Sequence, residues 1–349
     1  MAKTKRHKTL AILLLLVMTL LNASTANAIK EGSIAANDSS VVAIFFGKYG
    51  NSSRCSGVYL RDRIVLTAAH CILQRQLSTG DVIQDVPKWL PFDYYVSNPG
   101  SNWKDDVEHR VRVLSYFVPR PYEEKWQTTY PGRERDIAFL FLEEPLEGKS
   151  INQIATKEMV EFAQLRGQTL QVFGYGNLDF QTLNDGTPFY AEVKARFRKS
   201  DRLDVDGSLY SSSLGMGKGS TCPGDSGGPI ILEIDQKKYL YGITFGGGTQ
   251  TCHFGTPHFG NWSVESTLVW PFVKLIETEY ESFLLTEAKA KAEAEAKAKA
   301  EAEAKAKAEA EAKAKAEAAK KTMISCFKGK VTKKVTGVNP KCPAGYKKK

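Results

Sequence analysis

Two short segments of the chain place reactive side chains where nucleophilic catalysis is favoured. The two side chains are those of His70 and Ser226, and the segments are Thr67-Ala68-Ala69-His70-Cys71 and Gly224-Asp225-Ser226-Gly227-Gly228-Pro229. A serine hydroxyl becomes a strong nucleophile when a nearby base removes its proton and donors stabilise the oxyanion that forms. Imidazole titrates near neutral pH, and glycine lets the backbone turn sharply and present its N–H groups. The two segments are therefore a candidate base and nucleophile for hydrolysis.

Asp136 is a third candidate because it directly precedes an apolar run over 137–142. A carboxylate at the edge of a buried strand can orient an imidazole and stabilise its charged form. An aspartate before a strand is uninformative alone, and the remaining histidines, His7, His109, His253 and His258, have no comparable setting. The order His, Asp, Ser is what makes the set specific.

The sequence between 29 and 275 predicts a series of short strands, and these must position the three residues. Runs rich in β-branched and aromatic residues occur at 41–46, 63–66, 137–142, 171–173 and 239–244, with Gly, Asn, Asp and Pro between them. This pattern predicts an all-β sandwich or barrel with few helices. The stretch 74–135 is long, polar and rich in Pro, Trp and Tyr, so we expect most of it to be surface loop.

The N-terminus reads as a secretory signal. Residues 1–28 carry four basic and no acidic side chains, an apolar run over 10–21, and a small-x-small site at Ala26-Asn27-Ala28. The run is short for a bilayer span, although an uncleaved membrane anchor is the alternative. We expect a signal peptide over 1–28, a mature chain starting at Ile29, and no membrane span after cleavage.

The net charge of +9 is unevenly distributed. Residues 1–28 carry +4 and residues 320–349 carry +10 from ten lysines, whereas eight Glu and eight Lys cancel over 287–319. The body over 29–286 therefore has a charge of −5. This distribution argues against nucleic-acid binding by the main domain.

The segment 287–318 consists of four copies of Glu-Ala-Lys-Ala-Lys-Ala-Glu-Ala. Ala, Glu and Lys are good helix formers, and the repeat places opposite charges four residues apart, as in Lys289 and Glu293. No apolar stripe runs along it, so no coiled coil is implied. We expect a solvated helical linker over 281–321, and a disordered low-complexity linker is the alternative.

The last segment, 322–349, is a small basic module that contains Cys326 and Cys342. It is too short to bury much core, so we expect it to depend on one disulfide. It is similar to short C-terminal modules on some bacterial exported proteins. Six cysteines in an exported chain predict disulfides, and spacing suggests three local pairs, but sequence alone allows fifteen pairings.

Over about 29–275 the sequence resembles the trypsin/chymotrypsin-like serine peptidase family. The segments around His70 and Ser226 match the family's histidine and serine motifs, and two further matches are Asp136-Ile137-Ala138 and Gly174-Tyr175-Gly176. The resemblance implies two antiparallel six-stranded β-barrels with the site in the cleft between them, as a peptidase domain over 29–280. It also selects the local disulfide pairs Cys55–Cys71, Cys222–Cys252 and Cys326–Cys342.

The resemblance implies a role for each matched residue. Ser226 would attack the scissile carbonyl, His70 would move the proton, and Asp136 would hold the imidazole. The N–H groups of Gly224 and Ser226 would form the oxyanion hole. Family members become active when a new N-terminal ammonium inserts beside the aspartate before the nucleophile, so Ile29 would pair with Asp225.

Only Ile29 and Gly32 match the family's usual N-terminal sequence, but the expected signal cleavage falls directly before Ile29. We hypothesise that signal cleavage itself creates the activating terminus. The alternative is that Ile29 is merely the first residue of a tail.

The family's primary pocket is floored by the residue six before the nucleophile, here Ser220. Trypsin-like basic specificity uses Asp at that place, so the resemblance argues against a Lys/Arg preference. The pocket wall would be Thr244-Phe245-Gly246, which departs in two residues from the family's usual Ser-Trp-Gly. A histidine in the pocket, His253 or His258, would favour acidic residues, but ordinary loop histidines are the simpler interpretation.

The sequence thus predicts a secreted serine endopeptidase that acts on protein or peptide substrates through an acyl-enzyme, with no cofactor or metal. The alternative function is a non-catalytic cell-surface binding protein on a peptidase scaffold. Because its C-terminal tail is basic, we also expect the chain to associate with an anionic cell envelope.

Overall fold

The computed structural model describes residues 32–35, 39–51, 55–72, 93–119, 135–177, 184–196, 211–214, 221–247 and 264–349. The chain divides into two compact units, Met1–Glu281 and Ser282–Lys349. The boundary between them falls within the long helix α4 (Val273–Ala319).

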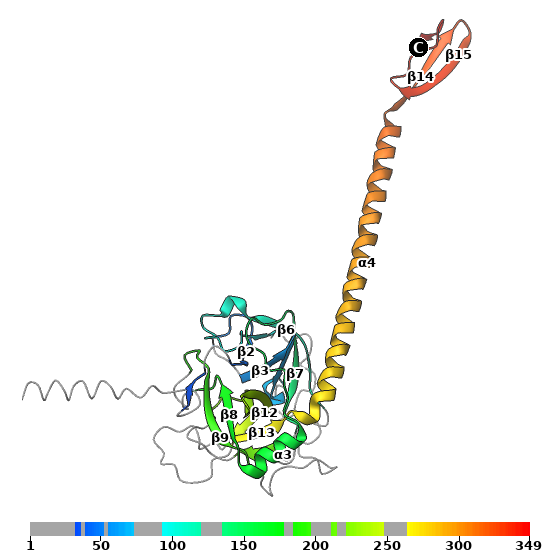
Figure 1. Ribbon diagram of the computed structural model, residues 1–349. Helices are drawn as coiled ribbons and strands as arrows, with labels where there is room; N and C mark the ends of the chain where they lie inside the picture. The colour runs from blue at the N-terminus through cyan, green and yellow to red at the C-terminus, as the bar shows by residue number, and fades with distance from the viewer. Residues whose placement is uncertain are drawn as a thin grey trace, which may run out of the picture. The chain divides into compact units, whose positions relative to one another are not determined.

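Six strands of the first unit close into a barrel in the order β2-β3-β4-β7-β6-β5. They are β2 (Val41–Phe46), β3 (Cys55–Arg61), β4 (Ile64–Thr67), β5 (Tyr94–Val96), β6 (Val111–Phe117) and β7 (Ala138–Leu142), and every pair is antiparallel. In Figure 1 these strands are coloured from blue to green and form the upper part of the unit. The barrel prediction is confirmed for this half of the domain.

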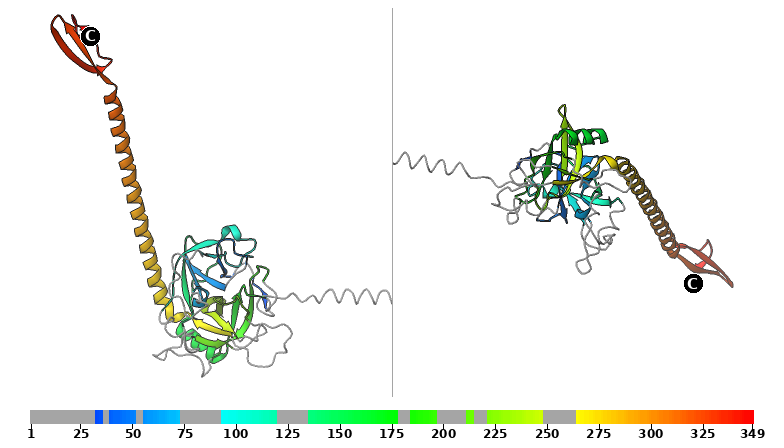
Figure 2. Two further views of the ribbon diagram at one scale, coloured as in Figure 1. Left: turned by 180° about the vertical axis from the view of Figure 1, so that it is seen from behind. Right: turned by 90° about the horizontal axis from the view of Figure 1, so that it is seen from below.

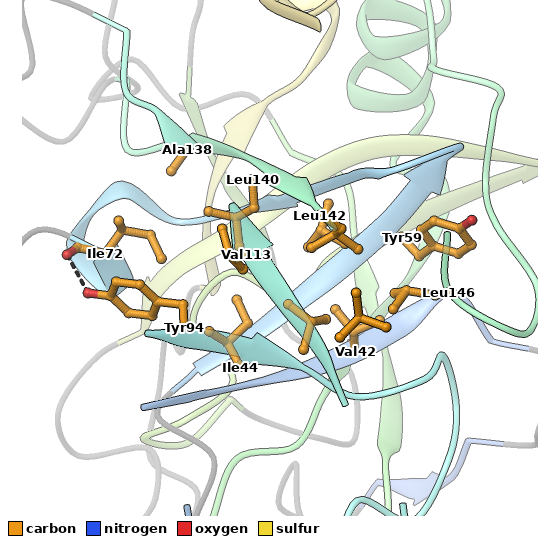
Figure 3. Close-up of a cluster of buried hydrophobic side chains, with 13 residues drawn as sticks. Val42, Ile44, Tyr59, Ile72, Tyr94, Val113, Ala138, Leu140, Leu142 and Leu146 are labelled. Carbon is orange, nitrogen blue, oxygen red and sulfur yellow. Dashed lines mark hydrogen bonds between the residues drawn. The ribbon is translucent and has the colours of Figure 1, made fainter. Parts of the chain in front are cut away.

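The barrel is filled by side chains that alternate along its strands. In β6 the side chains of Val111 and Val113 point inward and those of Arg112 and Leu114 are exposed, as the two-residue period of a strand requires. Figure 3 shows Ile72 and Tyr94 at one end of this core, where the Tyr94 hydroxyl donates to the Ile72 carbonyl at 2.7 Å.

Both faces of β7 are buried, which the unbroken apolar run Ala-Phe-Leu-Phe-Leu anticipates. Leu140 points into the barrel, whereas Phe139 and Phe141 contact Phe272 and Tyr280 on the outside. Those partners belong to η3 (Trp270–Phe272) and to the start of α4. The C-terminal end of this unit therefore packs against the strand that follows Asp136.

The expectation of a mostly looped stretch over 74–135 does not anticipate the regular elements within residues 93–119. These residues supply β5, the short η1 (Val107–His109) and β6, two of the six barrel strands. β5 has only three residues, and β6 interleaves apolar with polar residues, so neither gives a continuous apolar run. Both strands are fixed by pairing with β2 and β7 rather than by their own sequence.

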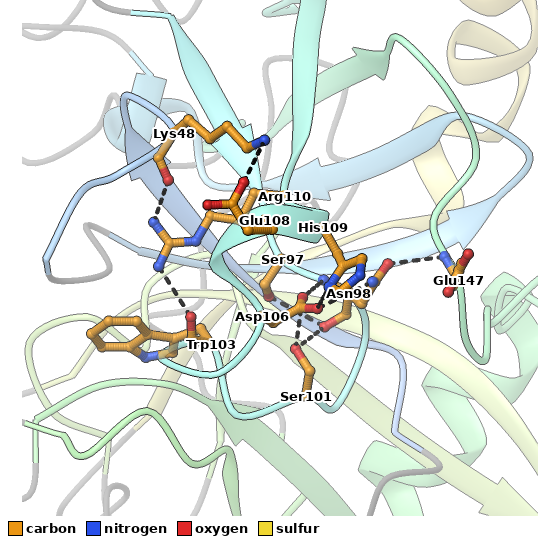
Figure 4. Close-up of polar contacts among 10 residues, drawn as sticks. All are labelled: Lys48, Ser97, Asn98, Ser101, Trp103, Asp106, Glu108, His109, Arg110 and Glu147. Atoms are coloured by element: carbon orange, nitrogen blue, oxygen red, sulfur yellow. Dashed lines mark hydrogen bonds and ion pairs between the residues drawn. The ribbon is translucent and has the colours of Figure 1, made fainter.

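The loop between β5 and β6 is held by a buried aspartate (Figure 4). Asp106 accepts hydrogen bonds from the Asn98 N–H at 2.7 Å and from the Ser101 hydroxyl at 3.1 Å, and His109 Nδ1 lies 3.4 Å from its other oxygen. The guanidinium of Arg110 donates to the carbonyls of Lys48, Gly50 and Trp103. These contacts give the loop a fixed shape that the second half of the domain uses.

The second half contains a seven-stranded antiparallel sheet in the order β1-β9-β8-β11-β12-β13-β10. Its strands are β1 (Ser33–Ile34), β8 (Thr169–Gly174), β9 (Phe189–Lys194), β10 (Ser211–Leu214), β11 (Pro229–Ile234), β12 (Lys237–Gly247) and β13 (Val264–Leu268). The views in Figure 2 show these strands, which are green to yellow except for the blue β1, beside the first barrel. The described strands do not form a closed ring, so the second barrel stays a prediction.

The helix α3 (Lys157–Arg166) packs Val160 and Ala163 onto this sheet. It begins after Thr156, whose hydroxyl accepts from the Met159 N–H, and ends at Gly167 in the left-handed conformation. The sequence pattern does not single out this helix, because its apolar residues do not share one face: Val160 and Ala163 are buried, whereas Phe162 and Leu165 are exposed.

The charged repeat is helical, as expected: it forms the larger part of α4. Lys289 and Glu293 lie 4.0 Å apart, and Lys297 and Glu301 lie 3.9 Å apart, so the four-residue charge spacing is used. No helix in the described part of the chain is long and apolar enough to cross a membrane.

The C-terminal residues form a small sheet, β14 (Lys321–Lys328), β15 (Val331–Val338) and β16 (Lys347–Lys348), in the order β15-β14-β16. The disulfide Cys326–Cys342 is present, as is Cys55–Cys71 in the first unit, so both of these predicted pairs are confirmed. Cys222 is also disulfide-bonded, and its predicted partner Cys252 lies outside the described residues.

Candidate active site

Strand pairing brings His70 and Asp136 together although they are 66 positions apart. β4 and β7 are antiparallel neighbours, with Thr67 opposite Ala138, so the end of β4 and the start of β7 lie at the same edge. His70 follows β4 in the short α2 (Ala69–Ile72), and Asp136 precedes β7. The register of the barrel therefore sets this contact.

The carboxylate of Asp136 makes two hydrogen bonds to His70. Its Oδ1 accepts from the His70 backbone N–H at 3.0 Å, and its Oδ2 lies 2.7 Å from Nδ1 of the ring. The Asp136 side chain is buried, and its backbone carbonyl accepts from the Thr267 hydroxyl at 3.2 Å. Because a carboxylate only accepts, Nδ1 carries the proton and the lone pair of the ring is on Nε2.

Ser226 lies in a tight turn that is fixed to the first barrel. The turn is closed by hydrogen bonds from the Asp225 N–H to the Cys222 carbonyl and from the Gly228 N–H to the Asp225 carbonyl, both at 3.0 Å. The Ser226 carbonyl accepts from the Ser56 N–H of β3 at 2.8 Å, and Cys71 Sγ lies 3.7 Å from the same oxygen. The structure thus places Ser226 beside the residue that follows His70.

Two backbone donors in this turn are free among the described residues. Neither the Gly224 N–H nor the Ser226 N–H donates to another described residue. Gly224 has φ +100°, a conformation that glycine adopts without strain and other residues rarely adopt. Gly224, Ser226 and His70 are each half-buried rather than fully buried.

Asp225 points away from this surface and is fully buried. Its carboxylate accepts from the N–H groups of Gly176 and Cys222, both at 2.7 Å. A Cβ on Gly176 would lie 2.5 Å from the carboxylate, which explains the glycine there. Burial raises the pKa of Asp225 to about 7, against the two hydrogen bonds that lower it. Its predicted partner Ile29 lies outside the described residues.

The raised pKa of Asp225 predicts a pH-dependent stability for the chain that retains residues 1–28. As pH rises, the carboxyl of the unfolded chain ionises near the ordinary aspartate pKa of 3.8, whereas the folded one holds its proton until about 7. The free energy of unfolding should therefore fall by up to about 4 kcal/mol between these pH values and change no further above them. Urea unfolding at several pH values checks this, with Asp225→Asn as the control. If the free energy of unfolding depends equally on pH in the wild type and in Asp225→Asn, this prediction is wrong.

The described part of the expected pocket wall is tied to the nucleophile turn. The Gly227 N–H donates to the Thr244 carbonyl at 2.5 Å, and the Thr244 N–H donates to the Gly228 carbonyl at 2.9 Å. Thr244 and Phe245 are buried, and β12 and β13 shift register between Thr244 and Gly246. The remaining predicted pocket residues, Ser220, His253 and His258, lie outside the described residues.

Two residues that support the site from the first barrel have no role that the sequence predicts. Ser56 contacts the nucleophile turn, and the hydroxyl of Thr67 donates to the Ser56 carbonyl at 2.8 Å. Thr67 belongs to the histidine motif, but nothing in the sequence marks Ser56 except its place after Cys55. The sulfurs of Cys55 and Cys71 also lie close to His70. Their disulfide leaves no thiolate, so this group is no metal site.

A family model described as Trypsin matches residues 29–261. The chain belongs to the trypsin family. The match spans the first barrel, most of the second sheet and the three residues His70, Asp136 and Ser226.

Individual relatives are distant. Coagulation factor IX of Cavia porcellus is 24% identical over 198 residues, 54% of this chain and 62% of the relative. Seminase of Drosophila melanogaster is 26% identical over 193 residues, 53% of this chain and 62% of the relative. The chain thus spans about three fifths of the length of these curated relatives.

A solved structure shares the fold of this trypsin-family domain. Neuropsin, a serine protease expressed in the limbic system of mouse brain, superposes with a TM-score of 0.51 at 24% identity. The superposition covers 72% of this chain and 100% of neuropsin. The charged helix and the small C-terminal sheet lie beyond the residues that the family model matches.

Proposed function

We propose that this chain is an exported serine endopeptidase that hydrolyses peptide bonds in protein or peptide substrates through an acyl-enzyme at Ser226. The observation that carries the proposal is the 2.7 Å contact between His70 Nδ1 and Asp136 Oδ2 in a trypsin-family domain. That contact leaves Nε2 of His70 as a base, on the side of the ring away from Asp136.

The proposed reaction begins when Ser226 Oγ attacks the carbonyl carbon while Nε2 of His70 takes the hydroxyl proton. The charge that develops on the carbonyl oxygen is stabilised by the N–H groups of Gly224 and Ser226, and Asp136 stabilises the imidazolium. His70 then protonates the leaving amine as the C–N bond breaks. A water molecule repeats the two steps on the acyl-enzyme and releases the carboxylic acid.

A fluorophosphonate probe tests this function without knowledge of the substrate. Ser226 Oγ displaces fluoride from phosphorus, so the wild-type protein should be labelled and Ser226→Ala should not. The matched control is Ser115→Ala, which removes an exposed hydroxyl of β6 and should be labelled like the wild type. An unlabelled wild type, or equal labelling of Ser226→Ala, would favour the non-catalytic binding protein.

Activation is proposed to follow directly from export. If the signal peptide ends at Ala28, the new Ile29 ammonium would pair with the buried Asp225 carboxylate, whose described partners are uncharged N–H groups. The secreted protein should therefore begin at Ile29 and need no second cleavage. N-terminal sequencing of the active protein checks this, and any other first residue rules it out.

Substrate preference is proposed to exclude Lys and Arg at the cleaved bond, because Ser220 rather than an acid would floor the pocket beside Thr244, Phe245 and Gly246. Cleavage of a peptide library reports the preference directly. A preference for Lys or Arg would refute this part of the proposal.

A second role is proposed for the C-terminal residues: the basic module over 322–349, carried on the helical linker over 281–321, would associate with an anionic cell envelope. The outer face of β14 and β15 exposes Met323, Phe327 and Val338, and residues 320–349 contain ten lysines and no acid. If the association is electrostatic, salt should release the protein from cells. Attachment that salt does not weaken, or no attachment at all, would contradict it.

A further inference from the structure

Ser56 is the residue through which the first barrel holds the nucleophile turn. It lies near the start of β3, directly after the disulfide-bonded Cys55, and is fully buried. Its N–H donates to the Ser226 carbonyl at 2.8 Å, and its own carbonyl accepts from the Thr67 hydroxyl at 2.8 Å. Its hydroxyl makes two further hydrogen bonds, to Tyr175 and to Gly224.

The direction of the bonds at the Ser56 hydroxyl follows from their partners. The Tyr175 N–H lies 2.8 Å from Oγ, and a backbone N–H can only donate, so Oγ is the acceptor of that bond. The single hydroxyl proton is then directed to the Gly224 carbonyl, also at 2.8 Å. The hydroxyl thus links the Gly224 peptide to the turn that opens the second half of the domain.

Tyr175 is itself fixed at both ends. It is fully buried, and its phenol donates to the Ser101 carbonyl at 2.8 Å, in the loop that Asp106 holds. Tyr175 therefore cannot follow a movement of the Ser56 hydroxyl, and the anchor of the Gly224 carbonyl is rigid.

The Gly224 carbonyl belongs to the peptide group that joins Gly224 to Asp225. This peptide lies between the two that carry the Gly224 N–H and the Ser226 N–H. The Gly224 N–H peptide is held by the Asn177 N–H, which donates to the Pro223 carbonyl at 2.8 Å. Ser56 also donates hydrogen bonds to the carbonyls of Gly224 and Ser226. Together these bonds fix the angle between the Gly224 N–H and the Ser226 N–H. Glycine can adopt many backbone conformations besides the φ of +100° at Gly224, so this restraint is needed to keep the peptide groups in one orientation.

We propose that the Ser56 hydroxyl is a positioning group for the oxyanion-stabilising loop, which it holds by its hydrogen bond to the Gly224 carbonyl. The inference rests on the proposed peptidase function. Ser56 is fully buried and makes no hydrogen bond to His70 in the described part of the chain, so it acts through the orientation of the two N–H donors. A preorganised donor stabilises the transition state more than the bound substrate, so its misalignment lowers kcat rather than raising KM.

Ser56→Ala tests the proposal because it removes only the hydroxyl. Loss of one oxyanion donor costs ~10²–10³ in rate, and we expect part of that loss, about 10-fold to 100-fold in kcat, with KM within about twofold. The second-order rate of fluorophosphonate labelling should fall by a similar factor, since the phosphoryl oxygen occupies the same hole. The pH dependence of kcat/KM should keep its midpoint, because the described hydrogen bonds of His70 go to Asp136 and not to Ser56.

Thr67→Val is the matched control. It also removes one buried hydroxyl bonded to Ser56, but the hydrogen bond of that hydroxyl goes to the Ser56 carbonyl and not to a group of the nucleophile turn, and valine keeps the shape that packs against Gly227. It should lower the melting temperature comparably and leave labelling within about threefold of wild type. Ser56→Gly keeps the backbone hydrogen bonds and serves as the second variant if Ser56→Ala does not fold.

The outcomes separate this inference from the proposed function. The inference is supported if the wild type and Thr67→Val are labelled at similar rates and Ser56→Ala is labelled slowly. Equal labelling rates for wild type and Ser56→Ala overturn it and leave the peptidase function standing. Equal losses in Ser56→Ala and Thr67→Val also overturn it, because the effect is then one of stability. A wild type that is not labelled refutes the proposed function and this inference together.

Discussion

Asp136→Asn is expected to lower kcat by ~10⁴ at neutral pH while KM stays within a few-fold. In the wild type, one carboxylate oxygen accepts from the His70 backbone N–H and the other faces Nδ1. An asparagine has one oxygen, and the backbone N–H can only donate to it, so the amide NH₂ must face Nδ1. His70 then carries its proton on Nε2, where it cannot accept one from Ser226.

Steady-state kinetics on a substrate found by library screening measure the effect, with fluorophosphonate labelling as a second readout. The matched control is Asp106→Asn, because Asp106 also accepts from a backbone N–H and also lies beside a histidine Nδ1, that of His109. The control should lose stability in the loop between β5 and β6 but keep kcat within a few-fold. An Asp136→Asn variant that retains a tenth of wild-type kcat would contradict the role proposed for Asp136.

Gly227→Ala is expected to destabilise the fold by about 4 kcal/mol or more, among the largest single-residue effects. Gly227 has φ +84°, and a Cβ there would lie 2.1 Å from the Thr67 hydroxyl and 2.3 Å from the Ser56 carbonyl oxygen. It would also lie 2.9 Å from the Ala68 backbone nitrogen. The Ser56 oxygen belongs to β3 and the Ala68 nitrogen directly follows β4, so they cannot move without disturbing the barrel's pairing.

Urea unfolding of Gly227→Ala beside Gly47→Ala separates the two causes of this loss. Gly47 has a similar φ of +74°, but a Cβ there would meet nothing within 4 Å. Gly47→Ala should therefore lose only the roughly 1–2 kcal/mol of a left-handed alanine. If both variants lose the same free energy of unfolding, the close approach of the turn to β3 and β4 does not constrain this position.

Much of the first barrel could be predicted from sequence because its strands give clear local signals. The run over 41–46 is β2 without adjustment, and the run over 137–142 differs from β7 by one residue. β5 and β6 could not be predicted in the same way. Tyr94–Val96 is too short to show a two-residue period. β6 mixes apolar and polar residues and lies inside a polar stretch of sequence, so it does not stand out. Their assignment comes from non-local pairing, which single-sequence patterns do not contain.

The sequence by itself predicted the chemistry that is proposed for the chain. The types and order of His70, Asp136 and Ser226, with glycines at 224 and 227, predict a base, an orienting acid and a nucleophile, and the family resemblance implies which residue has which role. It also determined the helix of the charged repeat, since the four-residue charge spacing lies within the segment.

Only the tertiary structure decided how these groups meet. The register of β4 against β7 brings Asp136 to His70, and the hydroxyl of Ser56 reaches the Gly224 carbonyl across 168 positions of sequence. Ser56 could not be recognised in advance, because a serine beside a cysteine carries no signal until its partners are known. The physical reason is that a hydrogen bond depends on positions within a few tenths of an ångström, and these are set by strand pairing far along the chain.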